Sequence, residues 1–295
     1  MARTPQKAAR TAATLARNQD AQRPTTIEEF LAQQNEQDLL RFITCGSVDD
    51  GKSTLIGRLL WEAQQLFDDQ LATLQSESRK YGTQGQDIDF ALLVDGRAAE
   101  REQGITIDVA YRYFSTEQRK FIIGDAPGHE QYTRNMVTVA SSADAAVVLV
   151  DATKLPWQQA DFALLPQTRR HALLAHLLRV PSIGFAINKL DAVTDPALAF
   201  QRIRQALESF ANTAGIQVNA MVPVSALKGW NVVDRQPDWC GYQGPSLLEL
   251  LEQLPTTPSD DDQAMTFPVQ WVEKFHRSEE HTPELQSRLH LVCRL

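Results

Sequence analysis

Cysteines, long hydrophobic runs and clusters of basic residues are all scarce in this sequence. Its three cysteines, Cys45, Cys240 and Cys293, are too few and too widely spaced for a disulfide framework or a zinc site, so we expect reduced thiols. The longest continuous apolar run, residues 145–150, is far shorter than the roughly 20 residues of a membrane-spanning helix. A net charge of −8 argues against a nucleic-acid-binding surface. We therefore expect a cytoplasmic protein that binds neither nucleic acid nor a membrane.

What the sequence does contain is a series of short apolar runs that alternate with helical patterns. Strands are predicted at residues 39–45, 107–114, 120–124, 145–150, 182–188 and 220–226. Helices are predicted at residues 53–61, 166–179, 196–213 and 246–253. Continuous apolar strands that alternate with helices are typical of a mostly parallel sheet covered on both faces. The expected fold is therefore α/β and doubly wound, with a glycine-rich loop after the first strand.

That glycine-rich loop, GSVDDGKST, fits the phosphate-binding pattern G-x-x-x-x-G-K-[ST]. Its backbone N–H groups are expected to form an anion nest, and Gly46 and Gly51 allow phosphates a close approach. Lys52 is expected to reach the β- and γ-phosphates, and the Ser53 hydroxyl to bind Mg²⁺. The alternative is a chance turn at a helix start, and the motif alone serves kinases, ATPases and GTPases equally. The predicted phosphate-binding residues are Gly46, Ser47, Val48, Asp49, Asp50, Gly51, Lys52, Ser53 and Thr54.

A second motif, DAPGH, stands at the end of the strand predicted at residues 120–124. Asp125 is predicted to hold Mg²⁺ through water, and the Gly128 N–H to sense the γ-phosphate. His129 is the candidate for positioning the attacking water, the alternative being a structural histidine. The nucleotide-binding residues predicted here are Asp125, Ala126, Pro127, Gly128 and His129.

Thr106, in the segment GITID, is a candidate for a switch. Its hydroxyl is predicted to coordinate Mg²⁺ only while the γ-phosphate is present, which makes the segment an order–disorder switch. Read alone, the segment is an ordinary start of a strand, and only its place among the other motifs supports this interpretation. Lys52, Thr106 and His129 are the predicted catalytic residues.

The motif NKLD, residues 188–191, indicates which nucleotide is bound. The Asp191 carboxylate can accept hydrogen bonds from guanine N1–H and the exocyclic amine, a donor pair that adenine lacks. Asn188 is expected to tie this loop to neighbouring structure, and the Lys189 stem to cover the base. The alternative is an ordinary polar turn, but SALKG follows the next strand, and its amides around Ala226 are expected to meet guanine O6. The predicted guanine-binding residues are Asn188, Lys189, Asp191, Ser225, Ala226 and Leu227.

With these motifs in order, the chain resembles the translation-factor class of GTPases, which share D-x-P-G-H and N-K-x-D. Within that class it is more similar to the large, GTP-hydrolysing subunit of bacterial sulfate adenylyltransferase. The stretches that carry this similarity are GSVDDGKSTLIGRLL (46–60), LLVDGRAAEREQGITIDVAYRYF (92–114) and DAPGHEQYTRNM (125–136). The resemblance extends over residues 39–275 and implies a P-loop GTPase domain that two β-barrel domains follow in the family.

The resemblance also implies a heteromer that uses GTP and Mg²⁺. In it, a separate small catalytic subunit makes adenosine 5′-phosphosulfate and diphosphate from ATP and sulfate, and GTP hydrolysis on this chain helps drive that uphill reaction. Three alternatives stay open: an elongation-factor-type GTPase that delivers aminoacyl-tRNA, a P-loop kinase, and a regulatory switch with no metabolic enzyme attached. The net charge disfavours the first, and NKLD with SALKG disfavours the second.

Composition divides the chain into four parts. We expect a partly disordered extension at residues 1–38, the alternative being a transit peptide, and a GTP-binding domain at residues 39–256. A linker and the first strand of a truncated β-barrel domain are expected at residues 257–276. Residues 277–287 resemble, apart from Pro283, a translated sequencing-library adapter, so residues 277–295 are expected to be a non-native tail; the alternative is a genuine charged tail. The loop at residues 154–166 is either a partner contact or a tolerated insertion.

Overall fold

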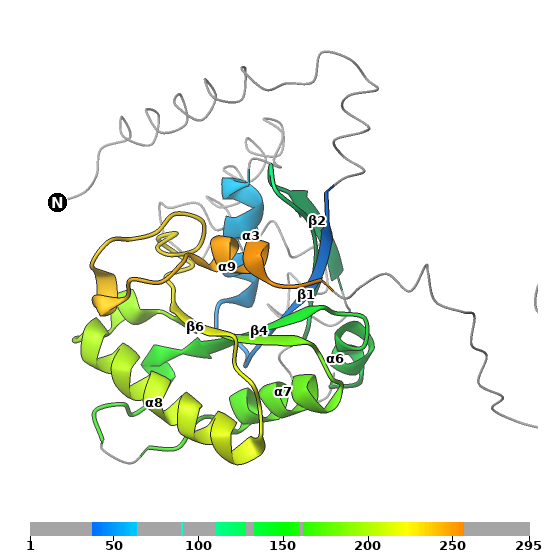
Figure 1. The fold of residues 1–295 in the computed structure, drawn as a ribbon. Coiled ribbons are helices and arrows are strands. Elements are labelled where there is room, and N and C mark those ends of the chain that lie inside the picture. The colour runs from blue at the N-terminus through cyan, green and yellow to red at the C-terminus, as the bar shows by residue number, and fades with distance from the viewer. Residues whose placement is uncertain (1–36, 64–89, 91–109, 128–132, 160–161, 257–295) are drawn as a thin grey trace, which may run out of the picture. The chain divides into compact units, whose positions relative to one another are not determined.

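The computed structural model describes residues 37–63, 90, 110–127, 133–159 and 162–256. Within them a six-stranded sheet has the order β2-β3-β1-β4-β5-β6 (Figure 1). The strands are β1 (Leu39–Cys45), β2 (Ala110–Ser115), β3 (Lys120–Asp125), β4 (Ala145–Asp151), β5 (Ser182–Asn188) and β6 (Ala220–Pro223). All neighbouring strands are parallel except β2 and β3. The carboxyl ends of β1, β3, β4 and β5 therefore meet at one edge of the sheet, and ligands of open α/β sheets bind outside such an edge.

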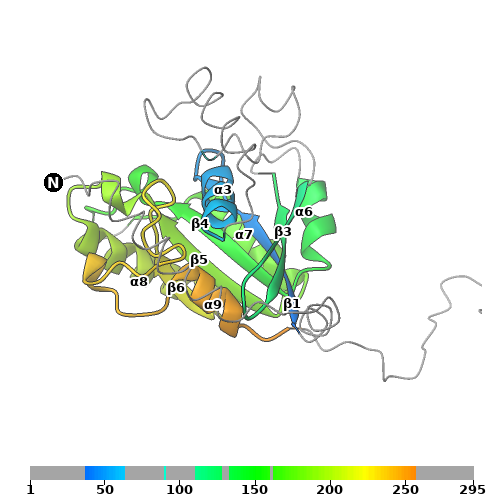
Figure 2. The ribbon, with the colours of Figure 1, turned by 90° about the horizontal axis from the view of Figure 1, so that it is seen from above.

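Helices cover both faces of this sheet (Figures 1 and 2). Helices α6, α7 and α8 lie on one face, and α3 and α9 lie on the other. Their bounds are α3 (Lys52–Glu62), α6 (Thr133–Ala140), α7 (Pro166–Leu177), α8 (Pro196–Ala214) and α9 (Leu247–Gln253). Between them, the described residues include the 3₁₀ turns η3 (Ala152–Lys154), η4 (Leu190–Ala192) and η5 (Trp239–Gly241).

Local sequence explains where α8 begins and ends and where α9 begins. The Asp195 side chain accepts the Leu198 N–H at the start of α8, and Gly215 ends that helix in the left-handed conformation. Ser246 and Glu249 form a reciprocal capping box at the start of α9.

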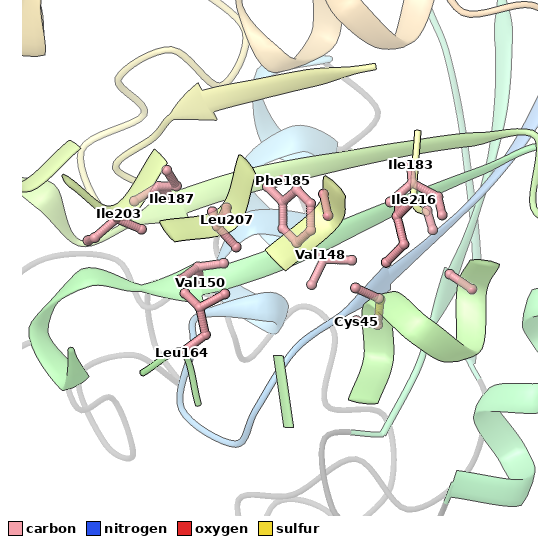
Figure 3. Packing of buried hydrophobic residues seen from close by; sticks show 14 of the residues in the cluster. Cys45, Val148, Val150, Leu164, Ile183, Phe185, Ile187, Ile203, Leu207 and Ile216 are labelled. Atoms are coloured by element: carbon pink, nitrogen blue, oxygen red, sulfur yellow. The ribbon is translucent and has the colours of Figure 1, made fainter. Parts of the chain in front are cut away.

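Two hydrophobic clusters hold the layers together, one on each face of the sheet. Figure 3 shows part of the first, in which Val148 and Val150 of β4 and Ile187 of β5 lie among side chains that include Ile203 and Leu207 of α8. The second cluster joins α3 and α9 to the opposite face. Because β4 is buried along its whole length, its sequence is apolar without alternation.

The structure confirms the expected fold class and most of the expected elements. The strands at 39–45 and 182–188 have the predicted bounds. β6 ends at Pro223 instead of residue 226, α7 ends at Leu177 instead of residue 179, and several other bounds differ by one residue; α6 was not predicted. Cys45 and Cys240 are buried free thiols, and burial raises the pKa of each to about 12. None of the helices in the described ranges is long and apolar enough to cross a membrane.

The chain separates into two compact units, Met1–Thr257 and Pro258–Leu295. The second unit lies outside the described residues, as does all of the N-terminal extension before residue 37. The predicted linker, barrel strand and non-native tail therefore stay predictions.

Candidate functional site

The predicted phosphate loop lies between β1 and α3, at the edge of the sheet where the parallel strands end. Gly51 precedes α3 with φ +91°, a left-handed conformation that L side chains rarely adopt. A Cβ at this position would lie 2.5 Å from Asn188 Nδ2. Two features therefore require glycine at position 51: its left-handed backbone conformation and the close approach of the Asn188 side chain.

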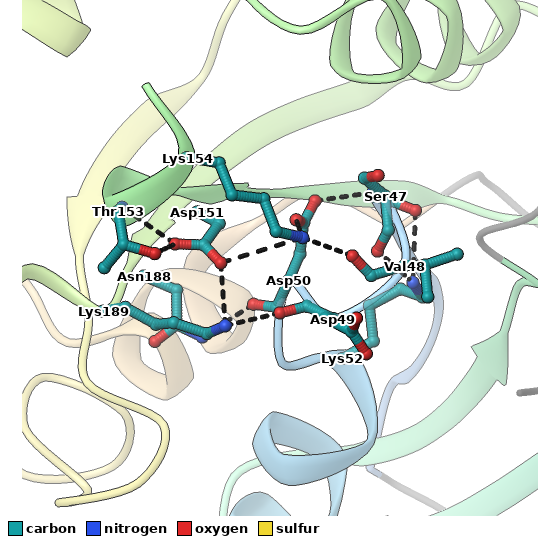
Figure 4. Close-up of polar contacts among 11 residues, drawn as sticks. Ser47, Val48, Asp49, Asp50, Lys52, Asp151, Thr153, Lys154, Asn188 and Lys189 are labelled. Carbon is teal, nitrogen blue, oxygen red and sulfur yellow. Dashed lines mark hydrogen bonds and ion pairs between the residues drawn. The ribbon is translucent and has the colours of Figure 1, made fainter. Parts of the chain in front are cut away.

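Every carbonyl oxygen from residue 46 to residue 50 accepts a hydrogen bond from a side-chain nitrogen (Figure 4). The pairs are Gly46 O and Ser47 O with Lys52 Nζ (3.1 and 2.8 Å), Val48 O with Lys154 Nζ, Asp49 O with Lys189 Nζ (2.5 Å), and Asp50 O with Asn188 Nδ2 (2.8 Å). In a planar trans peptide the next N–H points away from the carbonyl. Because five successive carbonyl oxygens accept hydrogen bonds from side chains, the directions of the loop's N–H groups are fixed. An anion nest requires such fixed N–H groups.

Charged side chains are buried around this loop. Lys52 is 7% exposed and Asp125 is fully buried, with Asp125 Oδ1 3.4 Å from the Thr44 hydroxyl that donates to it. Burial lowers the pKa of the Lys52 ammonium, and Asp125 and Asp50 act against that shift. A buried ammonium in a loop of oriented amides is suited to bind an anion.

Asn188 joins the phosphate loop to the segment after β6. Its Nδ2 donates to Asp50 O, and its Oδ1 accepts the Ala226 N–H at 3.0 Å. The expectation that Asn188 ties its loop to neighbouring structure is confirmed by these bonds. The Ala226 N–H is the donor predicted for guanine O6, and here it is bonded to Asn188.

The remaining guanine candidates lie on the same edge. Lys189 has φ +62°, and its Nζ lies between Asp49 O and Asp151 Oδ2, at 2.5 and 2.7 Å. Asp191 lies within η4, the turn that follows, with a side chain only 10% exposed, and its carboxylate lies 3.4 Å from Lys228 Nζ. The structure thus brings the phosphate loop, NKLD and SALKG to one edge, while the nucleotide-binding roles of these residues stay predictions.

Arg58 is a site-forming residue that the sequence analysis did not identify. It lies on α3, its Nε donates to Ala226 O at 3.2 Å, and its Nη2 donates to Leu227 O. Its guanidinium also stacks over Phe90 at 4.2 Å and pairs with Glu62 at 3.6 Å. Arg58 therefore fixes the SALKG segment to the helix that begins at the phosphate loop, and no local pattern in the sequence announces that contact.

The segment after β4 also contributes more than was predicted. Asp151 is fully buried and caps η3 by accepting the Thr153 N–H at 2.9 Å, which presents Lys154 to the phosphate loop. Further along this segment Trp157 packs into the core, where Arg202 Nη1 donates to its carbonyl at 3.0 Å. The start of the 154–166 loop is therefore part of the folded core as well as of the site.

Three predicted site residues lie outside the described residues: Thr106, Gly128 and His129. Within the described ranges, no group of three or more His, Cys, Asp or Glu side chains is placed to hold a metal ion. The predicted Mg²⁺ ligands are one carboxylate, Asp125, and the hydroxyls of Ser53 and Thr106, and their role stays a prediction.

Curated proteins similar to this chain confirm the resemblance read from the motifs. Sulfate adenylyltransferase subunit 1 of Sulfurovum sp. (strain NBC37-1) is 51% identical over 84% of this chain and 50% of its own length. The bifunctional enzyme CysN/CysC of Xylella fastidiosa is 56% identical over 84% of this chain and 39% of its own length. The chain thus spans half or less of the length of these relatives.

Solved structures and family membership agree with this. The GTPase-like domain of S. cerevisiae Ski7 bound to GTP superposes with a TM-score of 0.62 at 19% identity, over 78% of this chain and 51% of that one, a likeness of fold alone. The sequence model of the elongation factor Tu GTP binding domain matches residues 37–257, which include the whole described sheet and all the motifs above. The chain therefore belongs to the elongation factor Tu GTP binding domain family.

Proposed function

We propose that this chain binds and hydrolyses GTP as a subunit of a sulfate adenylyltransferase. The observation that carries GTP binding is the Asn188 side chain, which joins the phosphate loop to the SALKG segment through Asp50 O and Ala226 N. The assignment to sulfate activation rests on relatives that are 51% identical in sequence and are named sulfate adenylyltransferase subunit 1.

The phosphates would lie in the loop of residues 46–53. Its amides and the amino end of α3 favour negative charge, and Lys52 supplies a buried ammonium. Phosphoryl transfer to water needs positioning and charge stabilisation, with no covalent protein nucleophile. In this proposal Lys52 stabilises the charge that develops on the phosphates, Gly128 senses the γ-phosphate, and His129 positions the attacking water.

The residues present fit Mg²⁺. Magnesium prefers oxygen ligands and is commonly held by one or two carboxylates together with substrate phosphates. Asp125 is a fully buried carboxylate at the end of β3, and Ser53 is a hydroxyl in the first turn of α3. We assign Ser53, Asp125 and Thr106 to this ion, which when bound would neutralise charge on the β- and γ-phosphates.

Guanine would be read by Asp191 and by the backbone of residues 225–227. This carboxylate is only 10% exposed and has Lys228 Nζ at 3.4 Å; guanine N1–H and the exocyclic amine would give it two further hydrogen bonds, and adenine has no such donor pair. Lys189 reaches from this loop to Asp49 O, and its stem would lie along the base.

The partner in this proposal is the small catalytic subunit, which forms adenosine 5′-phosphosulfate and diphosphate from ATP and sulfate in the cytoplasm. An elongation-factor-type GTPase is the second candidate, because the family model that matches is that of elongation factor Tu.

The test is GTP turnover by this chain under three conditions: alone, with the small subunit plus ATP and sulfate, and with ribosomes plus aminoacyl-tRNA. Stimulation by the small subunit only when its substrates are present supports the proposal. Stimulation by ribosomes instead assigns the chain to translation. Failure of the chain to bind GTP at all contradicts both functions.

A further inference from the structure

The phosphate loop contains a buried negative charge. The Asp50 side chain is fully buried, and its Oδ2 accepts the Ser47 N–H at 2.5 Å. A carboxylate inside a loop that binds phosphates repels its ligand, and a buried charge is costly unless it is paired. Lys52 of the phosphate-binding motif acts on Asp50 through its charge, but its Nζ donates to Gly46 O and Ser47 O, so the ion pair with Asp50 is made by a residue outside the motif.

Lys154 forms that ion pair. Its Nζ lies 3.0 Å from Asp50 Oδ1 and 3.8 Å from Asp151 Oδ2, and it also donates to Val48 O. Burial raises the pKa of the Asp50 carboxyl, and the bond and charge of Lys154 act against that shift. One ammonium thus pairs with the carboxylate of the loop and holds one of its carbonyls.

The same cluster contains equal numbers of positive and negative side chains. Asp151 Oδ2 also pairs with Lys189 Nζ at 2.7 Å, so two carboxylates face two lysines between the phosphate loop and NKLD (Figure 4). Both carboxylates are fully buried, whereas the lysine side chains are 33% and 36% exposed. These pairs differ from ordinary surface ion pairs, which contribute little, because removing a lysine leaves a buried carboxylate unpaired.

We propose that Lys154 is a positioning residue for the nucleotide, acting through Asp50 and the Val48 carbonyl. It cancels the negative charge of Asp50 next to the phosphates. It also fixes the direction of the Asp49 N–H, because the peptide after Val48 is planar. This inference rests on the proposed binding of guanine nucleotides.

The test is isothermal titration calorimetry of GTP and GDP, with Mg²⁺, on the full chain and its variants. Lys154→Met is expected to weaken the binding of both nucleotides by about tenfold or more, equal to about 1.4 kcal/mol. Lys154→Arg keeps the charge and is expected to stay within about threefold of wild type. Asp50→Asn combined with Lys154→Met is expected to recover most of the loss, because it removes the charge that needed a partner.

Two further variants keep the test decisive. Arg204→Met removes a cation from an exposed ion pair on α8 and is expected to bind both nucleotides as wild type does. Lys154→Gln keeps a donor for Val48 O without the charge, so weak binding by Lys154→Gln beside normal binding by Lys154→Arg supports the proposal even where Lys154→Met unfolds. Thermal melts identify such unfolding.

The outcomes separate this inference from the proposed function. Wild-type affinity in both Lys154→Met and Lys154→Gln, with a wild-type chain that binds GTP, overturns the inference alone. A loss in Lys154→Met that Asp50→Asn does not relieve overturns the charge compensation. A folded wild-type chain that binds no guanine nucleotide overturns the proposed function and this inference together.

Discussion

Single residues connect the phosphate loop to the SALKG segment, and Asn188 does so with both ends of its amide. Motif reading identified Asn188 because it stands at a fixed place in NKLD. It did not identify Lys154, which contacts Asp50 from 104 positions away along the chain. A motif shows which residues its own loop contains. The positive charge of Lys154 comes from the segment after β4, and only the folded sheet brings that segment next to the phosphate loop.

Replacing Asn188 with alanine removes two buried hydrogen bonds at once. Asp50 O and the Ala226 N–H each lose a partner, and an unsatisfied buried group costs about 1–3 kcal/mol. We expect the free energy of unfolding to fall by about 2 kcal/mol or more, and GTP affinity to fall more than about tenfold. Urea denaturation and calorimetric titration measure these two quantities.

The matched control is Asn219→Ala. Asn219 Oδ1 accepts the Ile183 N–H at 2.9 Å near the amino end of β5, at the opposite end of that strand from Asn188. This variant is expected to lose stability and to keep its GTP affinity. Equal losses of GTP affinity in the two asparagine variants would show that Asn188 acts only through stability.

Asp191 offers a test of base recognition. A carboxylate presents two acceptors to guanine N1–H and its amine, whereas an amide presents one acceptor and one donor. Xanthine carries a carbonyl where guanine carries that amine. The side-chain amide that Asp191→Asn introduces can donate to this carbonyl, so the variant pairs better with xanthine than with guanine. We expect GTP affinity to fall by about a hundredfold or more and XTP to become the preferred ligand. Competition of GTP, XTP and ATP for a fluorescent nucleotide measures the order.

Lys228→Met is the control for that experiment. It removes the ion pair at 3.4 Å but keeps the carboxylate of Asp191. The order of nucleotide preference is expected to stay as in wild type. A continued preference of Asp191→Asn for GTP would remove Asp191 from base recognition.

At the scale of elements, hydrophobic pattern predicts strands better than short helices. The run at residues 182–188 is buried nearly throughout and has the predicted bounds. α6 was missed because its eight residues include Thr133, Val137, Thr138 and Val139, β-branched residues of low helix propensity. β6 ends at Pro223, although the Val224 N–H after it still donates to Ile187 O of β5 at 2.8 Å. The η turns have no pattern long enough to detect.

Helix α3 carries a partly buried acid, Glu62, whose ionisation depends on the fold. Burial raises the pKa of Glu62 from 4.5 to about 7, opposed by Arg58. The folded chain therefore binds a proton more tightly than the unfolded chain. This contribution to stability is complete below pH 4.5 and is lost as the pH rises through about 7.

We expect Glu62→Gln to remove that dependence on pH. Between pH 5 and pH 8 the free energy of unfolding of wild type should fall by about 2 kcal/mol more than that of the variant. Glu208→Gln removes an exposed carboxylate from α8 and should keep the wild-type slope. Denaturant titrations at the two pH values measure the slopes, and parallel slopes for wild type and Glu62→Gln would contradict the expectation.

At the scale of the whole described domain, the site belongs to the sheet edge and not to one loop. The phosphate loop follows β1, Lys154 follows β4, and Asn188 ends β5, while Ala226 lies beyond β6. Each of these strands is anchored in the two hydrophobic clusters. The sequence predicted this convergence, because parallel strands place their carboxyl ends together, but the cross-links between the loops could not be predicted from it.

Ligand binding at such an edge should stabilise the domain globally. A ligand that binds only the folded state at a hundred times its Kd adds about 2.7 kcal/mol, and each kcal/mol raises the Tm of a domain this size by about 2–4 °C. We therefore expect GTP with Mg²⁺ to raise the Tm by about 5–10 °C, and to raise it further as the nucleotide concentration increases. Scanning calorimetry measures the Tm. ATP at the same concentration should have little effect, because adenine does not offer the Asp191 carboxylate the pair of donors that guanine supplies. An equal shift with ATP would mean that the phosphate loop alone binds the nucleotide and that the contacts of Asn188 and Asp191 serve the fold without selecting the base.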